Sequence, residues 1–91
     1  MSGITRTLEI VNVKGLHARA SAKFVEKVEQ FDAEASVEKD GIQVSGDSIM
    51  GLLMLAAPIG SEITVTTSGR QASELADALQ ALVADYFGEG M

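Results

Sequence analysis

The sequence predicts an α+β fold, a two-layer sandwich in which three helices cover one face of a four-stranded antiparallel sheet. Two observations lead to this prediction. In four segments apolar residues alternate with polar ones, which is the period of a strand with one face in solvent. Elsewhere apolar residues recur at the spacing of amphipathic helices. At 91 residues, the chain 1–91 is expected to form a single domain, because chains of this length rarely build two cores.

The first half of the chain is expected to form a strand, a helix and a hairpin. Residues 4–10 alternate in polarity and predict the first strand. Residues 18–31 carry apolar side chains at helical spacing, with charged and amide side chains on the outer face. Strand patterns return at 33–38 and 42–44. The Asp-Gly pair at 40–41 between them is typical of a hairpin turn.

The second half is expected to add a helix, a strand and a last helix. Residues 49–55 predict a helix that ends before the proline and glycine following it. Residues 63–66 predict the fourth strand, and apolar positions at helical spacing over 75–86 predict the last helix. Residues 88–91 are expected to fray. The element order is therefore β-α-β-β-α-β-α, and the pattern alone suggests a ferredoxin-like strand order.

Composition excludes several classes of function. The chain has no cysteine and one histidine, so no metal site is expected. A formal charge of −6 argues against nucleic acid as a partner. The N-terminus does not resemble a signal peptide, and no apolar run is long enough for membrane insertion, so a cytoplasmic location is expected.

His17 is the candidate functional residue, because it stands where a loop becomes a helix. Unpaired amides and the helix dipole at such a position favour an anion, and Arg19 can pair with phosphate oxygens. The same positive groups are expected to keep the imidazole neutral near pH 7. A lone histidine is more often an ordinary surface or core residue, and Arg19 and Lys14 are ordinary surface charges when each is taken alone. Together they favour a phosphoryl acceptor.

The donor of this phosphoryl group is expected to be another protein. The chain has no glycine-rich phosphate loop and too few groups around His17 to bind a nucleotide as well. Nothing in the sequence supplies an acid–base pair with a substrate pocket beside His17. We therefore expect a phosphotransfer intermediate with no cofactor, and not an independent enzyme.

Two segments resemble a known family. Gly15-Leu16-His17-Ala18-Arg19 is similar to the active-site signature of the HPr family, the histidine-containing phosphocarriers of the bacterial phosphotransferase system. The segment from Ser48 to Leu53 resembles the family's regulatory-serine segment. The resemblance implies the strand order 1-4-2-3. It also implies that Enzyme I, supplied by phosphoenolpyruvate, phosphorylates Nδ1 of His17, that Arg19 supports the transfer, and that an Enzyme IIA receives the group.

One position departs from the family pattern. Many members of the family have proline directly after the arginine, whereas this chain has Ala20. Proline suits the first turn of a helix, so its absence loosens a geometric constraint and removes no reactive group. The departure bears on rate and partner preference and leaves the reaction itself in place.

Ser48 has two interpretations. A serine before a helix is an ordinary N-cap, contributing about 1 kcal/mol. The resemblance implies a regulatory role instead, because an HPr kinase/phosphorylase modifies this serine in many relatives. Phosphate at this position would add about −1.5 to −2 charges beside an apolar helix.

The helix after Ser48 is apolar on more than one side. Leu52 and Leu55 are the expected core residues. Ile49, Met50 and Leu53 are then expected to remain exposed and to form a docking surface for partners, since exposed apolar clusters commonly mark interfaces. The alternative is that the fold buries all of them.

Other functions remain open at this level. The domain could be a regulatory binding module whose phosphorylation state is only a signal, as in nitrogen-related branches of the phosphotransferase system. It could also be an interaction domain or small-ligand sensor in which His17 is not phosphorylated. A carrier serving sugar transport must reach several partners in turn, so a monomer is expected.

Overall fold

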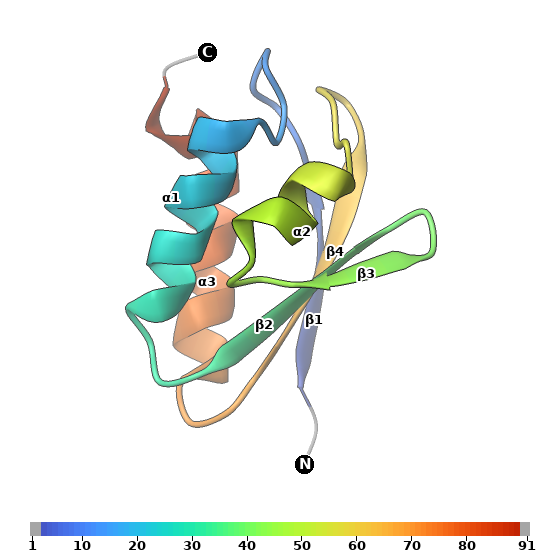
Figure 1. Ribbon diagram of the computed structural model, residues 1–91. Helices are drawn as coiled ribbons and strands as arrows, with labels where there is room; N and C mark the ends of the chain where they lie inside the picture. Colours follow the sequence, from blue (N-terminus) through green and yellow to red (C-terminus); the bar gives the residue numbers. More distant parts are fainter. Residues whose placement is uncertain (1–2, 90–91) are drawn as a thin grey trace.

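The structure is a computed structural model that describes residues 3–89, and its elements follow the predicted order (Figure 1). Within these residues the elements are β1 (Ile4–Glu9), α1 (Ala18–Glu29), β2 (Glu34–Lys39), β3 (Ile42–Ser45), α2 (Ile49–Met54), β4 (Glu62–Ser68) and α3 (Ala72–Ala84). A 3-10 turn, Tyr86–Gly88, follows α3.

The strands form one antiparallel sheet in the order β1-β4-β2-β3. This confirms the order 1-4-2-3 implied by the family resemblance and corrects the ferredoxin-like order suggested by the pattern alone. The register sets Leu8 opposite Ile63 and Val37 opposite Val65, so that buried apolar side chains of neighbouring strands share one face. Alternation specifies which face of a strand is buried and leaves open which strand lies beside it.

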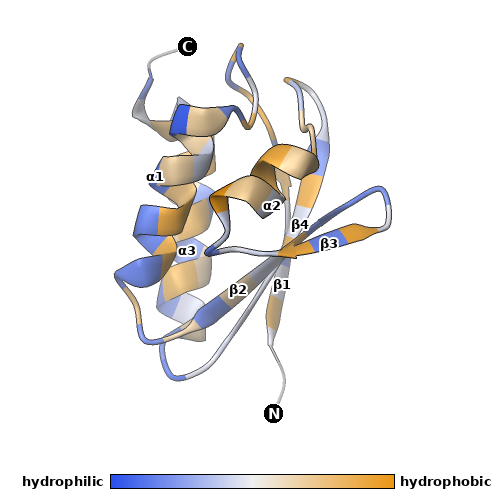
Figure 2. Ribbon diagram, viewed as in Figure 1, coloured by the Kyte–Doolittle hydropathy of each residue, from blue (hydrophilic) through white to orange (hydrophobic). Residues whose placement is uncertain are grey.

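The helices cover that apolar face. In Figure 1, α1 and α3 lie side by side and run in opposite directions, with the shorter α2 beside them. Figure 2 shows hydrophilic residues along the outer side of α1. The central core residues, each with no exposed surface, come from both layers: Phe24, Val37, Leu52, Ile63, Leu75 and Leu79. Leu55, at 4% exposure, joins Leu52 in the core as the sequence predicted.

The C-terminal segment differs from the prediction. Helix α3 ends at Ala84, and Tyr86, which the helical pattern placed with the buried residues, is exposed. Phe87 takes the buried position with no exposed surface. The predicted fraying is wrong for Gly88 and Glu89, since Gly88 belongs to the 3-10 turn and Glu89 is hydrogen-bonded to the first loop. The rest of that segment, 90–91, lies outside the described residues.

This architecture brings three chain segments to one end of the molecule. The loop between β1 and α1, the loop between α2 and β4, and the C-terminal turn all lie at the top of Figure 1. From residue 3 to residue 89, no helix is long and apolar enough to cross a membrane.

Candidate functional site

His17 is the N-cap residue of α1. Its backbone is extended, and the first hydrogen bond of the helix runs from the Ser21 amide to the His17 carbonyl oxygen at 2.8 Å. The amides of residues 18–20 precede that bond and have no acceptor within the helix. The side chain of His17 is 27% exposed. The imidazole is therefore reachable from solvent beside unpaired amides and the positive end of the helix dipole, as the sequence predicted.

The loop before His17 is held by backbone contacts to the α2–β4 loop. The Leu16 amide donates to the carbonyl oxygen of Ala57 at 2.9 Å, and the Leu16 side chain is buried. Gly15 has a φ of +67°, and a Cβ at this position would collide with the same carbonyl oxygen. Glycine is thus required here both by the left-handed backbone and by the close approach.

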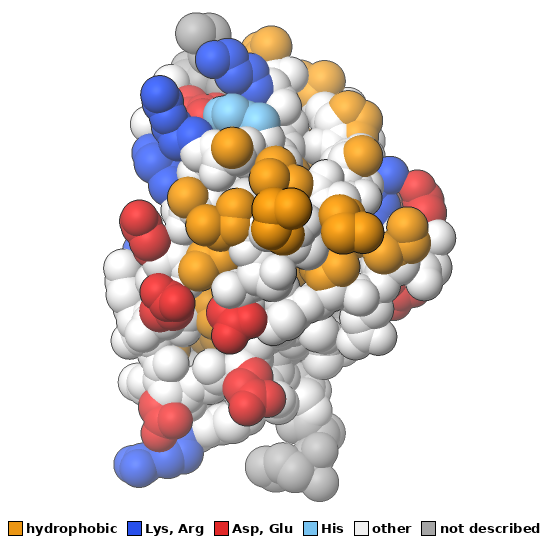
Figure 3. Space-filling model, in the orientation of Figure 1, with side chains coloured by type: hydrophobic (Ala, Val, Ile, Leu, Met, Phe, Trp, Pro, Cys, Tyr) orange, Lys and Arg blue, Asp and Glu red, His pale blue; other side chains and the backbone are white. Residues whose placement is uncertain are grey.

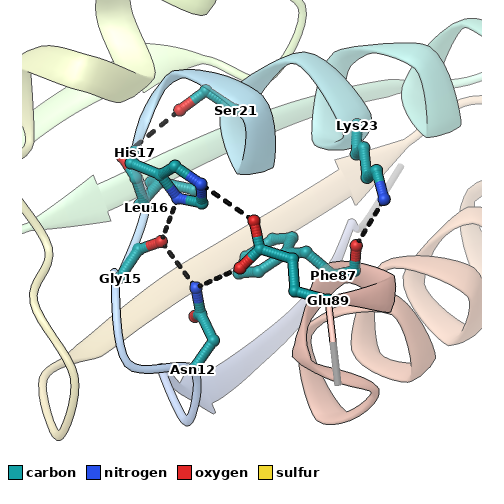
Figure 4. Close-up of polar contacts among 8 residues, drawn as sticks. All are labelled: Asn12, Gly15, Leu16, His17, Ser21, Lys23, Phe87 and Glu89. Atoms are coloured by element: carbon teal, nitrogen blue, oxygen red, sulfur yellow. Dashed lines mark hydrogen bonds and ion pairs between the residues drawn. The ribbon is translucent and has the colours of Figure 1, made fainter. Parts of the chain in front are cut away.

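Both ring nitrogens of His17 face oxygen atoms (Figure 4). Nδ1 lies 3.0 Å from the carbonyl oxygen of Gly15, and Nε2 lies 2.8 Å from Oε2 of Glu89. The buried side-chain amide of Asn12 links the two oxygen atoms, because its Nδ2 donates to the Gly15 oxygen at 2.8 Å and to Oε1 of Glu89 at 3.2 Å. The sequence argument had placed only positive groups around the imidazole, and the structure adds a carboxylate.

A hollow of about 330 Å³ opens beside this network. Its lining combines three cations with one carboxylate: Val13, Lys14, Arg19, Lys23, Gly88 and Glu89. Arg19 is exposed, and its guanidinium makes no ion pair with any residue of the described chain. Lys14, interpreted from the sequence as a surface charge when taken alone, is also exposed and lines the same hollow. A free guanidinium at such a rim can pair with an incoming phosphoryl group.

Sequence reasoning missed three residues of this site: Asn12, Lys23 and Glu89. None of them belongs to a motif, and Asn12 and Glu89 lie at opposite ends of the chain. One signal was available for the C-terminal residue. Helices commonly end near a glycine whose neighbours make a hydrophobic contact, so Phe87-Gly88 could have indicated a turn after the last helix with a large side chain available for burial.

Ser48 and the apolar residues after it lie on the neighbouring helix. The Ser48 hydroxyl oxygen accepts a hydrogen bond from the Gly51 amide at 3.0 Å, which makes it the N-cap of α2. From the sequence, Ile49, Met50 and Leu53 were expected to remain exposed, with burial of all three as the alternative. Ile49 is 40% exposed, Met50 is 70% exposed and Leu53 is half-buried.

Met54, which the sequence analysis did not include, is also 70% exposed. We call Ile49, Met50, Leu53 and Met54 the α2 patch. Figure 3 shows apolar side chains gathered over α2, with the histidine above them between that patch and a group of Lys and Arg side chains. The same face of the molecule therefore offers an imidazole, cations and an apolar surface.

No group of three or more potential metal-ligating side chains occurs between residues 3 and 89. The polar groups nearest His17 are a carboxylate, an amide and a carbonyl, which suit the positioning of an imidazole.

Comparisons with known proteins identify the family. Residues 4–85 match the family described as "PTS HPr component phosphorylation site". The phosphocarrier protein HPr of Cupriavidus necator is 47% identical over 87 residues, which cover 96% of this chain and 98% of that protein. The phosphocarrier protein NPr of Shewanella violacea is 38% identical over 98% of both chains.

A solved structure gives the same result. The crystal structure of HPr-C-His from Thermoanaerobacter tengcongensis superposes with a TM-score of 0.91, at 36% identity, covering 97% of this chain and 99% of that one. Sequence and fold agree over nearly the whole length of the chain. The chain therefore belongs to the HPr family, the phosphocarrier proteins of the phosphotransferase system.

Proposed function

We propose that this protein accepts a phosphoryl group on Nδ1 of His17 from Enzyme I, with phosphoenolpyruvate as the ultimate donor, and passes it to an Enzyme IIA in the cytoplasm. One observation carries the proposal: the imidazole stands at the start of α1, next to a hollow lined by Lys14, Arg19 and Lys23. Unpaired helix amides and a free guanidinium beside a partly exposed nucleophile suit phosphoryl transfer.

The chemistry requires a lone pair on Nδ1. That lone pair forms the new N–P bond while the bond from phosphorus to the donor breaks and its electrons return to the donor. Arg19 and the amides at the start of α1 stabilise the negative charge on the transferring oxygens. In the second transfer the N–P bond breaks and its electrons return to Nδ1, so the carrier regains its starting state.

The α2 patch supports a docking role. Ile49, Met50 and Leu53 lie exposed or half-buried on the helix next to the loop that holds His17, and methionine adapts to differently shaped partners. One surface would thus serve Enzyme I and Enzyme IIA in turn, which requires that the carrier act as a monomer. Phosphate placed on Ser48 by an HPr kinase/phosphorylase would introduce charge at the edge of this surface.

The transferred phosphoryl group could serve one of two processes, sugar transport or nitrogen-related regulation. The similar proteins include a phosphocarrier named HPr and a phosphocarrier named NPr, so similarity does not choose between these two roles. In the alternative proposal the domain is regulatory, and its phosphorylation state is only a signal to bound target proteins. That alternative predicts phosphorylation of His17 without onward transfer to any Enzyme IIA.

The test is phosphoryl transfer from phosphoenolpyruvate in the presence of purified Enzyme I, followed by intact mass measurement. We expect one acid-labile phosphoryl adduct on the wild type and none on His17→Ala. Addition of a sugar-specific Enzyme IIA should then remove the adduct. No adduct on the wild type with an active Enzyme I would refute the proposal, and an adduct that no Enzyme IIA removes would favour the signalling alternative.

A further inference from the structure

The C-terminal turn is shaped to hold Glu89 against the first loop. Tyr86 and Phe87 have φ angles of +58° and +52°, a left-handed conformation that is unfavourable for residues with a Cβ. Two contacts keep them there. The Phe87 side chain is fully buried, and the Lys23 ammonium donates to the Phe87 carbonyl oxygen at 2.9 Å (Figure 4). These contacts hold the left-handed turn, and the turn brings Glu89 to the loop that carries His17.

The Glu89 carboxylate is enclosed and has both oxygens engaged. The side chain is 13% exposed, with Oε2 at 2.8 Å from Nε2 of His17 and Oε1 at 3.2 Å from Nδ2 of Asn12. Nδ2 of Asn12 also donates to the Gly15 oxygen, so the side-chain amide faces two acceptors and can adopt only this orientation. Oδ1 of Asn12 is buried with no hydrogen-bond partner among the residues that the structure describes.

These contacts determine where the imidazole proton lies. The Gly15 carbonyl oxygen already accepts from the His17 amide at 2.9 Å and from Nδ2 of Asn12 at 2.8 Å. Two donors occupy its two lone pairs, so it is a poor acceptor for a third N–H from Nδ1. The carboxylate at Nε2 carries a full charge and is the stronger acceptor. In the neutral ring, the carboxylate therefore favours the proton on Nε2 and leaves the lone pair on Nδ1. Because Nδ1 faces the Gly15 oxygen at 3.0 Å, the ring must turn away from that oxygen before a phosphoryl group can reach the lone pair.

We infer that Glu89 is a positioning residue that prepares His17 for phosphoryl acceptance. Its carboxylate accepts the Nε2–H hydrogen bond and thereby leaves Nδ1 with the lone pair that forms the N–P bond. As that bond forms, positive charge spreads over the ring and the carboxylate stabilises it. Asn12 orients the carboxylate, and Phe87 and Lys23 hold its backbone. This inference rests on the proposed phosphorylation of Nδ1.

Two substitutions distinguish positioning from a merely structural contribution. In Glu89→Gln, the donor Nδ2 of Asn12 requires the glutamine oxygen at the Oε1 position, so the glutamine NH₂ group faces Nε2. Nε2 must then be an acceptor, which moves the ring proton to Nδ1 and removes the reactive lone pair. Glu89→Ala leaves the ring unrestrained but free to adopt either tautomer. The isosteric glutamine variant should therefore be the more damaging one, whereas a structural role predicts the reverse order.

The first measurement is the rate of phosphoryl transfer from phospho-Enzyme I. We expect Glu89→Ala to be about tenfold slower than the wild type and Glu89→Gln about a hundredfold slower. In other proteins, a catalytic histidine held in the wrong tautomer loses even more of its rate. Glu74→Gln, which removes the same charge from an exposed position at the start of α3, should match the wild type. Equal rates for the wild type and both Glu89 variants would overturn the inference while leaving the proposed function intact.

The second measurement does not depend on transfer. The ¹⁵N chemical shifts of the His17 ring, recorded with the imidazole neutral, report which nitrogen carries the proton. We expect the Nε2–H tautomer in the wild type, a mixture in Glu89→Ala, and the Nδ1–H tautomer in Glu89→Gln. Unchanged ring spectra in both variants would overturn the inference. A wild type that shows the expected tautomer but accepts no phosphoryl group from active Enzyme I would refute the proposed function instead.

Discussion

Gly15 packs against the carbonyl oxygen of Ala57 so closely that a Cβ on Gly15 would collide with that oxygen. The same oxygen accepts the hydrogen bond from the Leu16 amide at 2.9 Å, so one backbone contact joins the loop before His17 to the loop after α2. The position of the imidazole depends on this contact, because Leu16 directly precedes it.

We therefore expect Gly15→Ala to reduce both stability and transfer. The left-handed backbone alone costs an L-residue about 1–2 kcal/mol, and the collision with Ala57 adds to it. A loss of 1–2 kcal/mol corresponds to a fall in Tm of about 5–15 °C in a domain of this size. The measurements are thermal unfolding and the rate of phosphoryl transfer from Enzyme I.

Gly41→Ala is the matched control for this substitution. Gly41 also has a positive φ, +83°, but a Cβ there would meet nothing within 4 Å. It should carry only the backbone cost and leave the transfer rate unchanged. If Gly41→Ala were as destabilising as Gly15→Ala, the contact with Ala57 would have no separate importance.

Arg19→Ala should reduce phosphoryl transfer without reducing stability. The side chain is exposed and makes no ion pair within residues 3–89, so we expect the free energy of unfolding to change by less than about 0.5 kcal/mol. Loss of a donor to the transferring phosphoryl group should slow transfer by about a hundredfold. Arg19→Lys should recover only part of the rate, because an ammonium lacks the forked geometry of the guanidinium.

The control for Arg19 is Arg70→Ala, which removes an arginine that is 87% exposed and paired with Asp32 at 3.8 Å. Its transfer rate should equal that of the wild type. An equal loss of rate in both variants would indicate a general effect of charge on Enzyme I binding and would contradict a specific role for Arg19.

Phe87→Ala and Tyr86→Ala should have very different effects on stability. Phe87 is fully buried, so its truncation should cost about 3–5 kcal/mol, whereas Tyr86 is 39% exposed and should cost much less, about 1 kcal/mol or below. Urea unfolding monitored by circular dichroism measures both values. A larger loss of stability for Tyr86→Ala than for Phe87→Ala would indicate that Tyr86 is the buried residue, as the helical pattern suggested, and would contradict the structure.

Substitutions of Ser48 should separate its capping role from an effect of charge. Ser48→Ala removes the acceptor for the Gly51 amide and should destabilise the protein by about 1 kcal/mol while leaving partner affinity unchanged. Ser48→Asp keeps an N-cap acceptor but adds a negative charge beside the α2 patch. We expect it to weaken the binding of Enzyme I about tenfold, equivalent to about 1.4 kcal/mol, in isothermal titration calorimetry. Equal affinity of Ser48→Asp and the wild type would argue against regulation at this site.

Met50→Glu tests the α2 patch directly. The side chain is 70% exposed, so the fold should tolerate the change with less than about 0.5 kcal/mol lost. A buried carboxylate at an apolar interface is unfavourable, so the affinity for both Enzyme I and Enzyme IIA should fall by at least about tenfold. Thr7→Glu adds the same charge to an exposed position on β1 and should bind both partners normally. Normal binding by Met50→Glu would exclude this residue from the docking surface.

Local patterns in the sequence were sufficient for the elements and for the place of His17. Alternation identified the strands, and helical spacing identified Leu52 and Leu55 as core residues. The change from one period to the other at residue 18 placed His17 at the start of a helix. These properties depend on neighbours within a few positions along the chain, so the order of residues expresses them directly.

Local patterns did not predict the strand order or the structure of the C-terminal segment. Periodicity could not place β4 between β1 and β2, because a strand's alternation is the same whichever strand lies beside it. Helical spacing favoured Tyr86 as a buried residue, but two left-handed residues after Ala84 rotate the chain and bury Phe87 instead. The backbone departs from the helix there because burial of Phe87 and its contact with Lys23 outweigh the local cost.

The sequence by itself thus determined the fold class, and it singled out His17 as the candidate phosphoryl acceptor and Arg19 as the cationic residue two positions after it. Only the tertiary structure decided that Glu89 and Asn12 meet at the imidazole and that Lys14, Arg19 and Lys23 line one hollow. The physical reason is that a hydrogen bond between distant segments depends on how the sheet and helices pack. No spacing along the chain encodes the 2.8 Å between Glu89 and His17.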